Sequence, residues 1–229
     1  MKILGIIPAR GQSKGLPGKN IKLLADKPLI AYTIGAALES KFINRTIVST
    51  DDFEIMDIAK NFGAEVPFLR PDYLALDTTT TVEVVLDLLA NLKATEDYVP
   101  DYVCLLQCTS PLRNSADIDE CITQCLNSDF DACYSISEAE SSPYWMKIFD
   151  GQKLTSFIKT DTILRRQDLP KVYSLNGAIY FVKTSELLKY SSLHLPNATG
   201  YIMPRNRSVD IDTDIDFELA QILAKKGSL

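Results

Sequence analysis

A glycine-rich, positively charged loop follows the first apolar run of the chain. Its sequence, PARGQSKGLPGKN (residues 8–20), holds three glycines and the three cations Arg10, Lys14 and Lys19. Glycine lets backbone N–H groups approach an anion closely, and the cations balance the charge of that anion. The loop therefore predicts a polyphosphate site, and an ordinary basic surface turn is the alternative.

Two familiar phosphate loops do not fit this spacing. A Walker A loop needs Gly, four residues and then Gly-Lys-Ser/Thr, but Ser13 stands five residues before Gly18 and Asn20 follows Lys19. The dinucleotide fingerprint GxGxxG is also absent from the loop.

A run of alternating aspartates near the end of the chain is the second candidate. In an extended segment Asp210 and Asp212 face the same side, and two such carboxylates suit Mg²⁺ that also binds substrate phosphates. An EF-hand is rejected because Ile215 and Gln221 stand where it needs Gly and Glu. Asp214 and Asp216 are expected at the start of a helix. For Asp210 and Asp212 the residues alone leave metal ligation and an ordinary polar role equally open.

Two amides stand at the ends of predicted strands. Gln107, in LLQCTSPLR (105–113), could contact a sugar hydroxyl, although an amide that satisfies its own loop is the simpler interpretation. Asn176, in NGAIYF (176–181), indicates by itself only an Asn-Gly turn that enters a strand.

The elements that must position these residues alternate between strand and helix periodicity. Apolar runs predict strands at 3–9, 46–50, 66–69, 102–107, 131–137 and 177–182, and helical spacing predicts helices at 28–38, 53–62, 82–92, 115–126 and 215–224. This alternation is typical of an α/β protein with a mostly parallel sheet, in which ligands bind at the carboxyl ends of the strands. Residues 138–173 do not continue this alternation of strands and helices. They predict a segment that leaves the main sheet, within a single domain of residues 1–229.

Composition excludes several classes of protein. Lys plus Arg is 24 and Asp plus Glu is 30, and this net charge of −6 disfavours nucleic acid and anionic membranes as partners. The single histidine, His194, excludes a two-histidine zinc motif. The five cysteines form no CxxC pair, and their odd number without a signal peptide predicts a cytoplasmic location. No apolar run reaches the roughly 20 residues of a membrane span.

Six segments together resemble the acylneuraminate cytidylyltransferase family: IPARGQSKGLPGKN (7–20), STDD (49–52), EVPFLRP (65–71), LLQCTSPLR (105–113), NGAIYF (176–181) and MPRNRSVDIDT (203–213). The resemblance implies a three-layer, Rossmann-like α/β nucleotidyltransferase fold with a mostly parallel central sheet, and a homodimer. It also implies Mg²⁺-dependent transfer of CMP from CTP to the anomeric hydroxyl of a nine-carbon 2-keto acid sugar, with release of pyrophosphate.

The resemblance also implies roles for individual residues. The nucleotide-binding set is Ala9, Arg10, Gly11, Ser13, Lys14, Lys19, Asn20, Arg70 and Thr81, in which Arg10 and Lys14 hold the triphosphate while Asn20 and Thr81 help to select cytosine. The sugar-binding set is Gln107, Arg166 and Asn176, and the Mg²⁺ ligands are Asp210 and Asp212. The catalytic set is Arg10, Lys14 and Asp212. Residues 138–173 resemble a dimerisation arm that completes the sugar pocket of the partner subunit.

Three departures from the family pattern concern the sugar more than the nucleotide. Cys108 replaces the usual proline, Thr81 replaces a serine and keeps its hydroxyl, and Ser174 stands where many sialic acid enzymes carry arginine. N-acetylneuraminate, legionaminate and other nonulosonates therefore all remain candidate substrates. An eight-carbon Kdo-type sugar fits less well, because Gln107 replaces an expected acidic residue. A nucleotide-binding relative without catalysis is a further alternative, against which the intact Arg10, Lys14, Asp210 and Asp212 argue.

Overall fold

A six-stranded sheet in the order β10-β6-β9-β5-β1-β4 forms the centre of the molecule. The computed structural model describes residues 1–12, 15–158 and 165–228. The strands of the sheet are β1 (Ile3–Pro8), β4 (Arg45–Ser49), β5 (Tyr102–Leu105), β6 (Ala132–Glu138), β9 (Tyr173–Lys183) and β10 (Ala198–Ile202). β1 pairs parallel with β4 and β5, β10 pairs parallel with β6, and β9 pairs antiparallel with both β5 and β6. The sheet is therefore mostly parallel.

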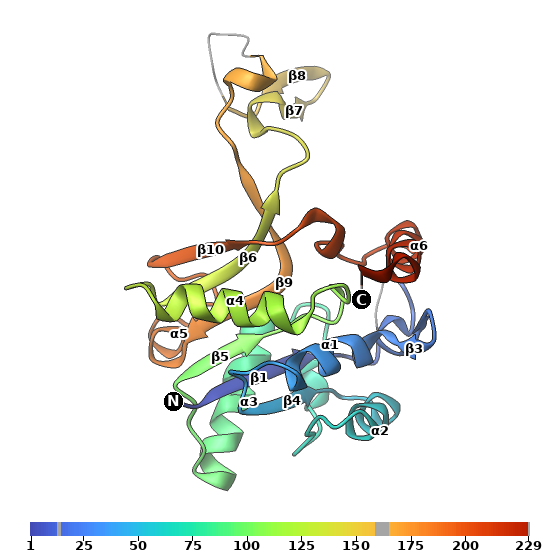
Figure 1. Cartoon of the computed structure of the whole chain (residues 1–229), viewed down its shortest axis with the longest axis vertical. Coiled ribbons are helices and arrows are strands. Elements are labelled where there is room, and N and C mark those ends of the chain that lie inside the picture. Colours follow the sequence, from blue (N-terminus) through green and yellow to red (C-terminus); the bar gives the residue numbers. More distant parts are fainter. Residues whose placement is uncertain (13–14, 159–164, 229) are drawn as a thin grey trace.

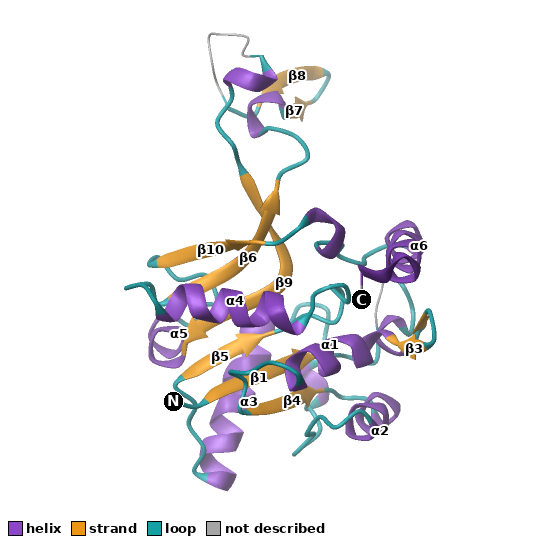
Figure 2. Cartoon of the chain, viewed as in Figure 1, coloured by secondary structure: helices purple, strands orange, loops and turns teal. Residues whose placement is uncertain are grey.

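Helices cover both faces of the sheet, which makes three layers (Figure 2). Along β1, Ile3 and Ile7 pack in one buried cluster, which holds side chains of α1 (Leu29–Leu38), α2 (Phe53–Asn61) and α4 (Ser115–Leu126). Leu4 and Ile6 point to the other face and pack with α3 (Thr81–Glu96) and α5 (Thr184–Tyr190). Since side chains alternate along a strand, an unbroken apolar run fills both cores at once. The predicted three-layer α/β fold is confirmed.

A third, smaller cluster fixes the carboxyl-terminal helix α6 (Asp214–Leu223). Phe217 and Ala220 of this helix are buried with Leu16, Leu24 and Ile211. Two short strands, β2 (Leu23–Leu24) and β3 (Lys27–Pro28), pair beside it. α6 is thereby joined to the segment that follows the glycine-rich loop.

Several predicted elements need correction. Residues 66–69 form no strand, because only Glu65 makes an isolated bridge, to Ile47. β9 begins at Tyr173, so Asn176-Gly177 is no turn at a strand entrance but an irregularity inside a long strand, where Gly177 has φ +75° and the pairing register with β6 shifts. The sequence interpretation placed no element at α5 or β10.

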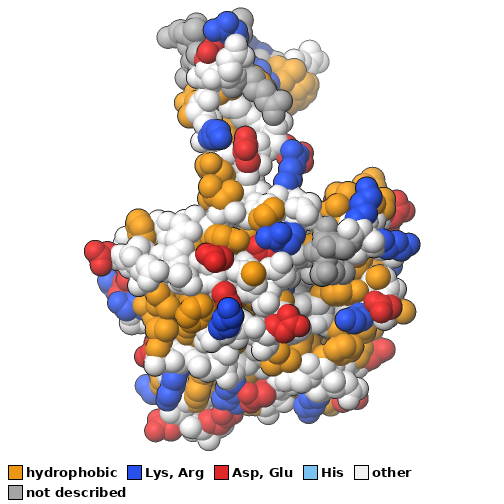
Figure 3. Space-filling model, in the orientation of Figure 1, with side chains coloured by type: hydrophobic (Ala, Val, Ile, Leu, Met, Phe, Trp, Pro, Cys, Tyr) orange, Lys and Arg blue, Asp and Glu red, His pale blue; other side chains and the backbone are white. Residues whose placement is uncertain are grey.

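A slender arm projects from the body between the end of β6 and the start of β9 (Figure 1). It carries the hairpin of β7 (Lys147–Asp150) and β8 (Lys153–Ser156) and the short 3-10 helices Pro143–Trp145 and Arg166–Asp168. Hydrophobic side chains lie exposed along the arm (Figure 3). Within residues 1–12, 15–158 and 165–228, no helix is both long and apolar enough to cross a bilayer.

Candidate active site

The loop after β1 lies at the carboxyl edge of the sheet and is held by contacts with the next strand's end. The backbone N–H of Ala9 donates to the carbonyl of Ser49 at 2.9 Å, and that of Gly11 donates to the Asp51 carboxylate at 3.1 Å. The amide of Asn20 closes the loop by donating to the carbonyl of Arg10 at 2.9 Å. The described part of the loop is thus fixed at its start and at its end.

Lys19 joins this loop to the acidic segment near the end of the chain. The side chain is only 10% exposed, and its ammonium group lies 2.5 Å from the carbonyl oxygen of Ile211 and 3.3 Å from the carboxylate of Asp212. Gly15 approaches the same place so closely that a Cβ on it would lie 2.5 Å from the carbonyl oxygen of Asp212. Two motifs at opposite ends of the sequence therefore form one structure.

A cavity of 490 Å³ opens between these segments. Seven of the predicted site residues line it: Arg10, Lys19, Asn20, Arg70, Thr81, Gln107 and Asp212. Three of the seven carry a positive charge in an otherwise acidic chain. This volume suits a small-molecule ligand, and the cations favour an anionic one.

Arg70, like Lys19, is a buried cation of this cavity. The side chain is held against the end of β4, where Nη2 donates to the carbonyl of Ser49 at 2.5 Å and Nε to its hydroxyl at 3.2 Å. Burial lowers the pKa of the guanidinium, the charge of Asp51 opposes this shift, and the charge of Arg10 adds to it. Such a cation gains from an incoming anion because the protein leaves part of its charge uncompensated.

Asp210 and Asp212 reach two adjoining clefts. Asp212 lines the 490 Å³ cavity, whereas Asp210 lines a second cleft of 580 Å³, between the base of the arm and α6, together with Ser174, Arg205 and Ser208. Burial of the Asp210 carboxylate within its cleft raises its pKa, as does the charge of Asp212, while a hydrogen bond from Thr109 opposes the shift. A cation bound by both carboxylates would relieve this repulsion.

The donor set suits Mg²⁺ only in combination with a substrate. Within the described ranges no cluster of three or more His, Cys, Asp or Glu side chains could hold a metal. Mg²⁺ commonly takes one or two protein carboxylates and fills its other positions with water and phosphate oxygens. The pair Asp210 and Asp212 fits that pattern in the number and chemistry of its ligands, although the two carboxylates line different clefts.

Other predicted site residues lie outside the 490 Å³ cavity. Ala9, at the start of the loop, is buried, and the backbone N–H of Gly11 donates to Asp51, which follows β4. Asn176 is buried, and its amide is fully engaged, since Oδ1 accepts from Ser135 at 2.6 Å and Nδ2 donates to Ser208 at 3.0 Å. Ser13 and Lys14 lie outside the described residues. The backbone of Arg166 belongs to the arm, and its side chain is likewise outside the description.

Sequence reasoning missed two residues of the site. The carboxylate of Asp77 lies 3.0 Å from Nη2 of Arg10 and lines the cavity, but nothing in its sequence neighbourhood marks it. Thr109 accepts a hydrogen bond from the backbone of Ile211 at 2.8 Å, and its hydroxyl contacts Asp210. Its place directly after the strand end in LLQCTSPLR could have marked it as a site residue.

A cationic loop and an acidic segment that meet at the carboxyl edge of a mostly parallel sheet are typical of α/β enzymes that act on nucleoside triphosphates. Residues 4–226 match the family model described as "Cytidylyltransferase". The chain belongs to this cytidylyltransferase family and is a nucleotidyltransferase enzyme, as the six motifs indicated.

Curated relatives extend over nearly the whole chain. The protein is 37% identical to a CMP-N,N'-diacetyllegionaminic acid synthase of Legionella pneumophila, over 97% of this chain and 96% of that protein. It is 36% identical to an N-acylneuraminate cytidylyltransferase of Streptococcus agalactiae, over 95% of this chain but 52% of that longer protein.

The solved structure of a CMP:2-keto-3-deoxy-manno-octonic acid synthetase complexed with CTP has a TM-score of 0.73, at 17% identity. The match covers 99% of this chain and 100% of that one, and it supports the fold.

Proposed function

We propose that this protein transfers the CMP group of CTP to the anomeric hydroxyl of a nine-carbon 2-keto acid sugar. The hydroxyl oxygen forms a bond to the α-phosphorus and gives up its proton to solvent, the bond from that phosphorus to the bridging oxygen of the β-phosphate breaks, and pyrophosphate leaves with the electron pair. The observation that carries this proposal is the cationic 490 Å³ cavity, which adjoins a second cleft through the neighbouring carboxylates Asp212 and Asp210.

The nucleotide occupies the first cavity in this proposal. Arg10, Lys14 and Lys19, with Ser13, hold the triphosphate and stabilise the charge that develops on pyrophosphate. Ala9 and Gly11 contribute by fixing the loop, because their N–H groups donate to Ser49 and Asp51. Asn20 and Thr81 contact cytosine, and Arg70 lies beside the nucleotide. In such a transfer most of the catalysis comes from two sources. Preorganised cations stabilise the developing negative charge, and the site holds the attacking and leaving oxygens in line with the phosphorus.

Asp210 and Asp212 would hold Mg²⁺ with the phosphate oxygens of CTP. When bound, the ion would neutralise charge on the phosphates and polarise the α-phosphate. Lys19 stabilises the segment that carries these two aspartates, because its ammonium group contacts the carbonyl of Ile211 and balances the charge of Asp212.

The sugar enters from the second cleft. Gln107 borders the nucleotide cavity and is available to a sugar hydroxyl, and Arg166 of the arm is proposed to bind the sugar carboxylate. Asn176 contributes through the local structure that it fixes, because its amide is engaged by Ser135 and Ser208. Ser174 lines this cleft, where a serine leaves more room and less charge than an arginine.

Pyrophosphate release is the direct test of the reaction. The protein is incubated with CTP, Mg²⁺ and a panel of N-acetylneuraminate, legionaminate, another nonulosonate and Kdo, with parallel samples in EDTA. We expect release with a nine-carbon sugar, weaker release with Kdo, and none in EDTA. CTP binding without product from any sugar would support a non-catalytic relative instead.

A substitution at Asp212 tests the proposed role of this residue as a metal ligand. Asp212→Ala is expected to abolish turnover while circular dichroism and thermal unfolding show a folded protein, because the exposed Asp212 side chain contributes little to packing. Asp214→Ala is the matched control, since this neighbouring carboxylate is equally exposed and pairs with Lys22 on the surface. Wild-type activity of Asp212→Ala would refute the metal role.

We also propose a homodimer in the cytoplasm. The arm exposes Trp145, Met146, Phe149, Leu154 and Phe157, which are large apolar side chains that a partner subunit would cover. All five cysteines are buried free thiols, which is consistent with a reducing compartment.

A further inference from the structure

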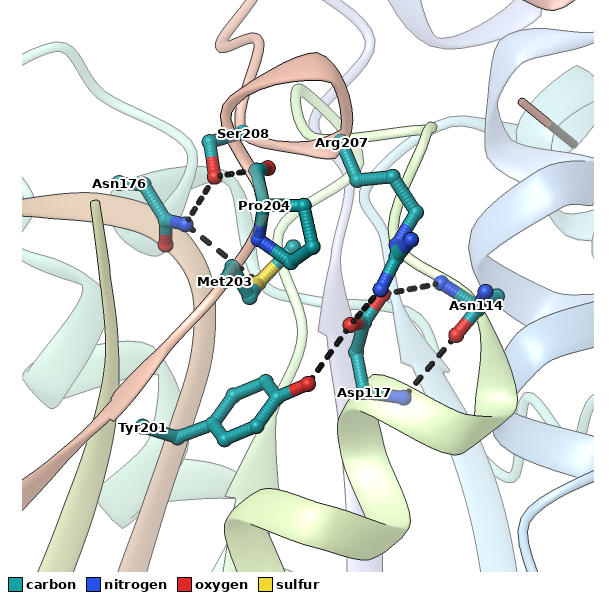
Figure 4. Close-up of polar contacts among 8 residues, drawn as sticks. All are labelled: Asn114, Asp117, Asn176, Tyr201, Met203, Pro204, Arg207 and Ser208. Carbon is teal, nitrogen blue, oxygen red and sulfur yellow. Dashed lines mark hydrogen bonds and ion pairs between the residues drawn. The ribbon is translucent and has the colours of Figure 1, made fainter. Parts of the chain in front are cut away.

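An ion pair between a fully buried carboxylate and a partly buried arginine lies outside both clefts but next to the acidic segment. Asp117, in the first turn of α4, is fully buried and accepts from Nε and Nη2 of Arg207 at 2.8 and 2.7 Å. The hydroxyl of Tyr201 donates to the same carboxylate at 3.0 Å, and the backbone N–H of Asn114 donates at 3.1 Å (Figure 4). Neither Asp117 nor Arg207 lines the nucleotide cavity or the second cleft.

The contacts of Arg207 fix the chain just before the two candidate metal ligands. The next residue, Ser208, accepts from the amide of Asn176 at 3.0 Å and donates to the carbonyl of Pro204 at 2.9 Å (Figure 4). The chain is thereby attached to α4 through Arg207 and to β9 through Ser208. Only Val209 separates these fixed points from Asp210.

The other side of the acidic segment is fixed as well. The backbone N–H of Ile211 donates to Thr109 at 2.8 Å, and that of Asp212 donates to the Asp216 carboxylate at 3.1 Å. The two carboxylates therefore project from a segment that is held on both sides and at its centre. Of these attachments, the Arg207–Asp117 pair makes the only two-pronged side-chain contact within the described residues around the segment.

An ion pair of this kind contributes little net free energy to folding. The cost of removing two charges from water offsets most of their attraction, and well-packed apolar residues often serve a core as well. A planar, two-pronged arginine–carboxylate contact does, however, specify direction and distance. Partners that orient metal ligands without touching the metal commonly change metal affinity or activity by 10- to 100-fold when they are lost.

We propose that Asp117 and Arg207 are positioning residues that set the placement of Asp210 and Asp212 for a divalent cation. This inference rests on the proposed metal role of the two aspartates. The pair acts through the backbone of residues 207–212 and touches neither the nucleotide nor the sugar.

The test compares two arginine-to-lysine variants. Arg207→Lys keeps the positive charge but loses the two parallel N–H donors. Arg45→Lys is the matched control, because Arg45 makes an equally close contact with Glu65, is similarly shielded (15% against 24% exposed), and lies at the start of β4, away from the site. The readouts are the Kd for Mn²⁺ in the presence of CTP, from the electron paramagnetic resonance signal of free Mn²⁺, and pyrophosphate release.

We expect Arg207→Lys to raise the Mn²⁺ Kd by about tenfold and to slow turnover, and Arg45→Lys to match the wild type. Wild-type Mn²⁺ affinity and turnover in a folded Arg207→Lys protein would overturn the positioning role and leave the proposed function intact. A wild-type protein that binds no Mn²⁺ with CTP and makes no product would overturn both.

Tyr201→Phe covers the case in which Arg207→Lys does not fold. This variant removes one hydrogen bond to Asp117 and retains the ion pair. A smaller rise in the same Kd, without a change in the fold, is expected. An unchanged Kd would overturn the inference.

Discussion

Lys19 shows how much of the site depends on one side chain. A lysine this buried normally needs compensation, and here the carbonyl of Ile211 and the carboxylate of Asp212 provide it. The Lys19 side chain also lines the 490 Å³ cavity, so in the proposed function it serves both as a structural link and as a cation for the ligand. Structural and chemical roles are therefore combined in one residue.

The variant Lys19→Met tests whether Lys19 acts through its specific contacts in the site or only as a surface charge. Methionine keeps an unbranched side chain of similar length but removes the charge and the donor. We expect kcat for pyrophosphate release to fall by about 10²–10³-fold, as for the loss of one donor to a developing oxyanion. Unfolding in urea should also show a loss of about 1–3 kcal/mol, because the carbonyl of Ile211 loses its partner.

Lys22→Met is the control for that experiment. Lys22 lies 3.4 Å from Asp214, a spacing close to that of the Lys19 pair, but it is more exposed and lines no part of the nucleotide cavity. Kinetics of Lys22→Met should resemble the wild type. Equal losses in the two variants would show that the Lys19 effect is not specific to the site.

At the scale of the element, α1 contains a glycine that its surroundings do not require. Gly35 lies inside the helix, and a Cβ on it would meet nothing within 4 Å. Glycine in a helix interior costs about 0.5–1 kcal/mol relative to alanine, mainly through the entropy of the unfolded chain. α1 is therefore less stable than its packing allows.

Gly35→Ala should raise the free energy of unfolding by about 0.5–1 kcal/mol, measured by urea denaturation. Gly200→Ala in β10 is the contrasting variant, since its Cβ would lie 2.7 Å from Cδ1 of Ile136. That variant should be destabilised or neutral at best. If Gly35→Ala instead destabilised the protein, the added methyl group would be meeting other atoms, and the prediction of open space beside α1 would be wrong.

The sequence predicted elements best where local signals suffice. The α4 helix has the predicted bounds, because Asn114 and Asp117 form a capping box at its start. The segment 66–69 was predicted as a strand from its apolar residues, but the single bridge at Glu65 provides no partner for them. β10 and α5 were missed, since β10 is an edge strand whose residues are largely half-exposed and α5 is short.

The site residues were likewise predictable where a local motif marks them, and not where they depend on contacts between distant parts of the chain. The composition of the motifs pointed to Arg10, Lys19, Gln107 and Asp212, and the family resemblance added Asn20, Arg70 and Thr81; all seven line one cavity. It could not show that Asp210 lines a different cleft, because that depends on the turn of the chain around Ile211. Nor could it pair Asp117 with Arg207, which are 90 residues apart.

At the scale of the whole molecule, the arm is the part least supported by its own contacts. Within the described residues the β7–β8 hairpin pairs with no third strand, and a two-stranded hairpin is marginally stable alone in water. Phe149, Leu154 and Phe157 are 60–68% exposed. Covering these side chains in a dimer would stabilise the hairpin and bring Arg166 toward a partner's cleft, as proposed.

The oligomeric state tests this view. The double variant Phe149→Ser/Leu154→Ser should shift the protein from dimer to monomer in sedimentation velocity, and it should raise KM for the sugar more than KM for CTP. Phe53→Ser is the control, because Phe53 is 66% exposed on α2 of the body. A wild-type protein that is monomeric at assay concentrations would contradict the dimer proposal.

The bond between Lys19 and the carbonyl of Ile211 also has a consequence for synthesis on the ribosome. These residues are 192 positions apart. At about 5–20 residues per second, roughly 10–40 s pass between the emergence of the two. Throughout that interval the cationic loop lacks the acidic segment that neutralises it, so a nascent chain can complete the candidate site only after residue 212 has been synthesised and has emerged.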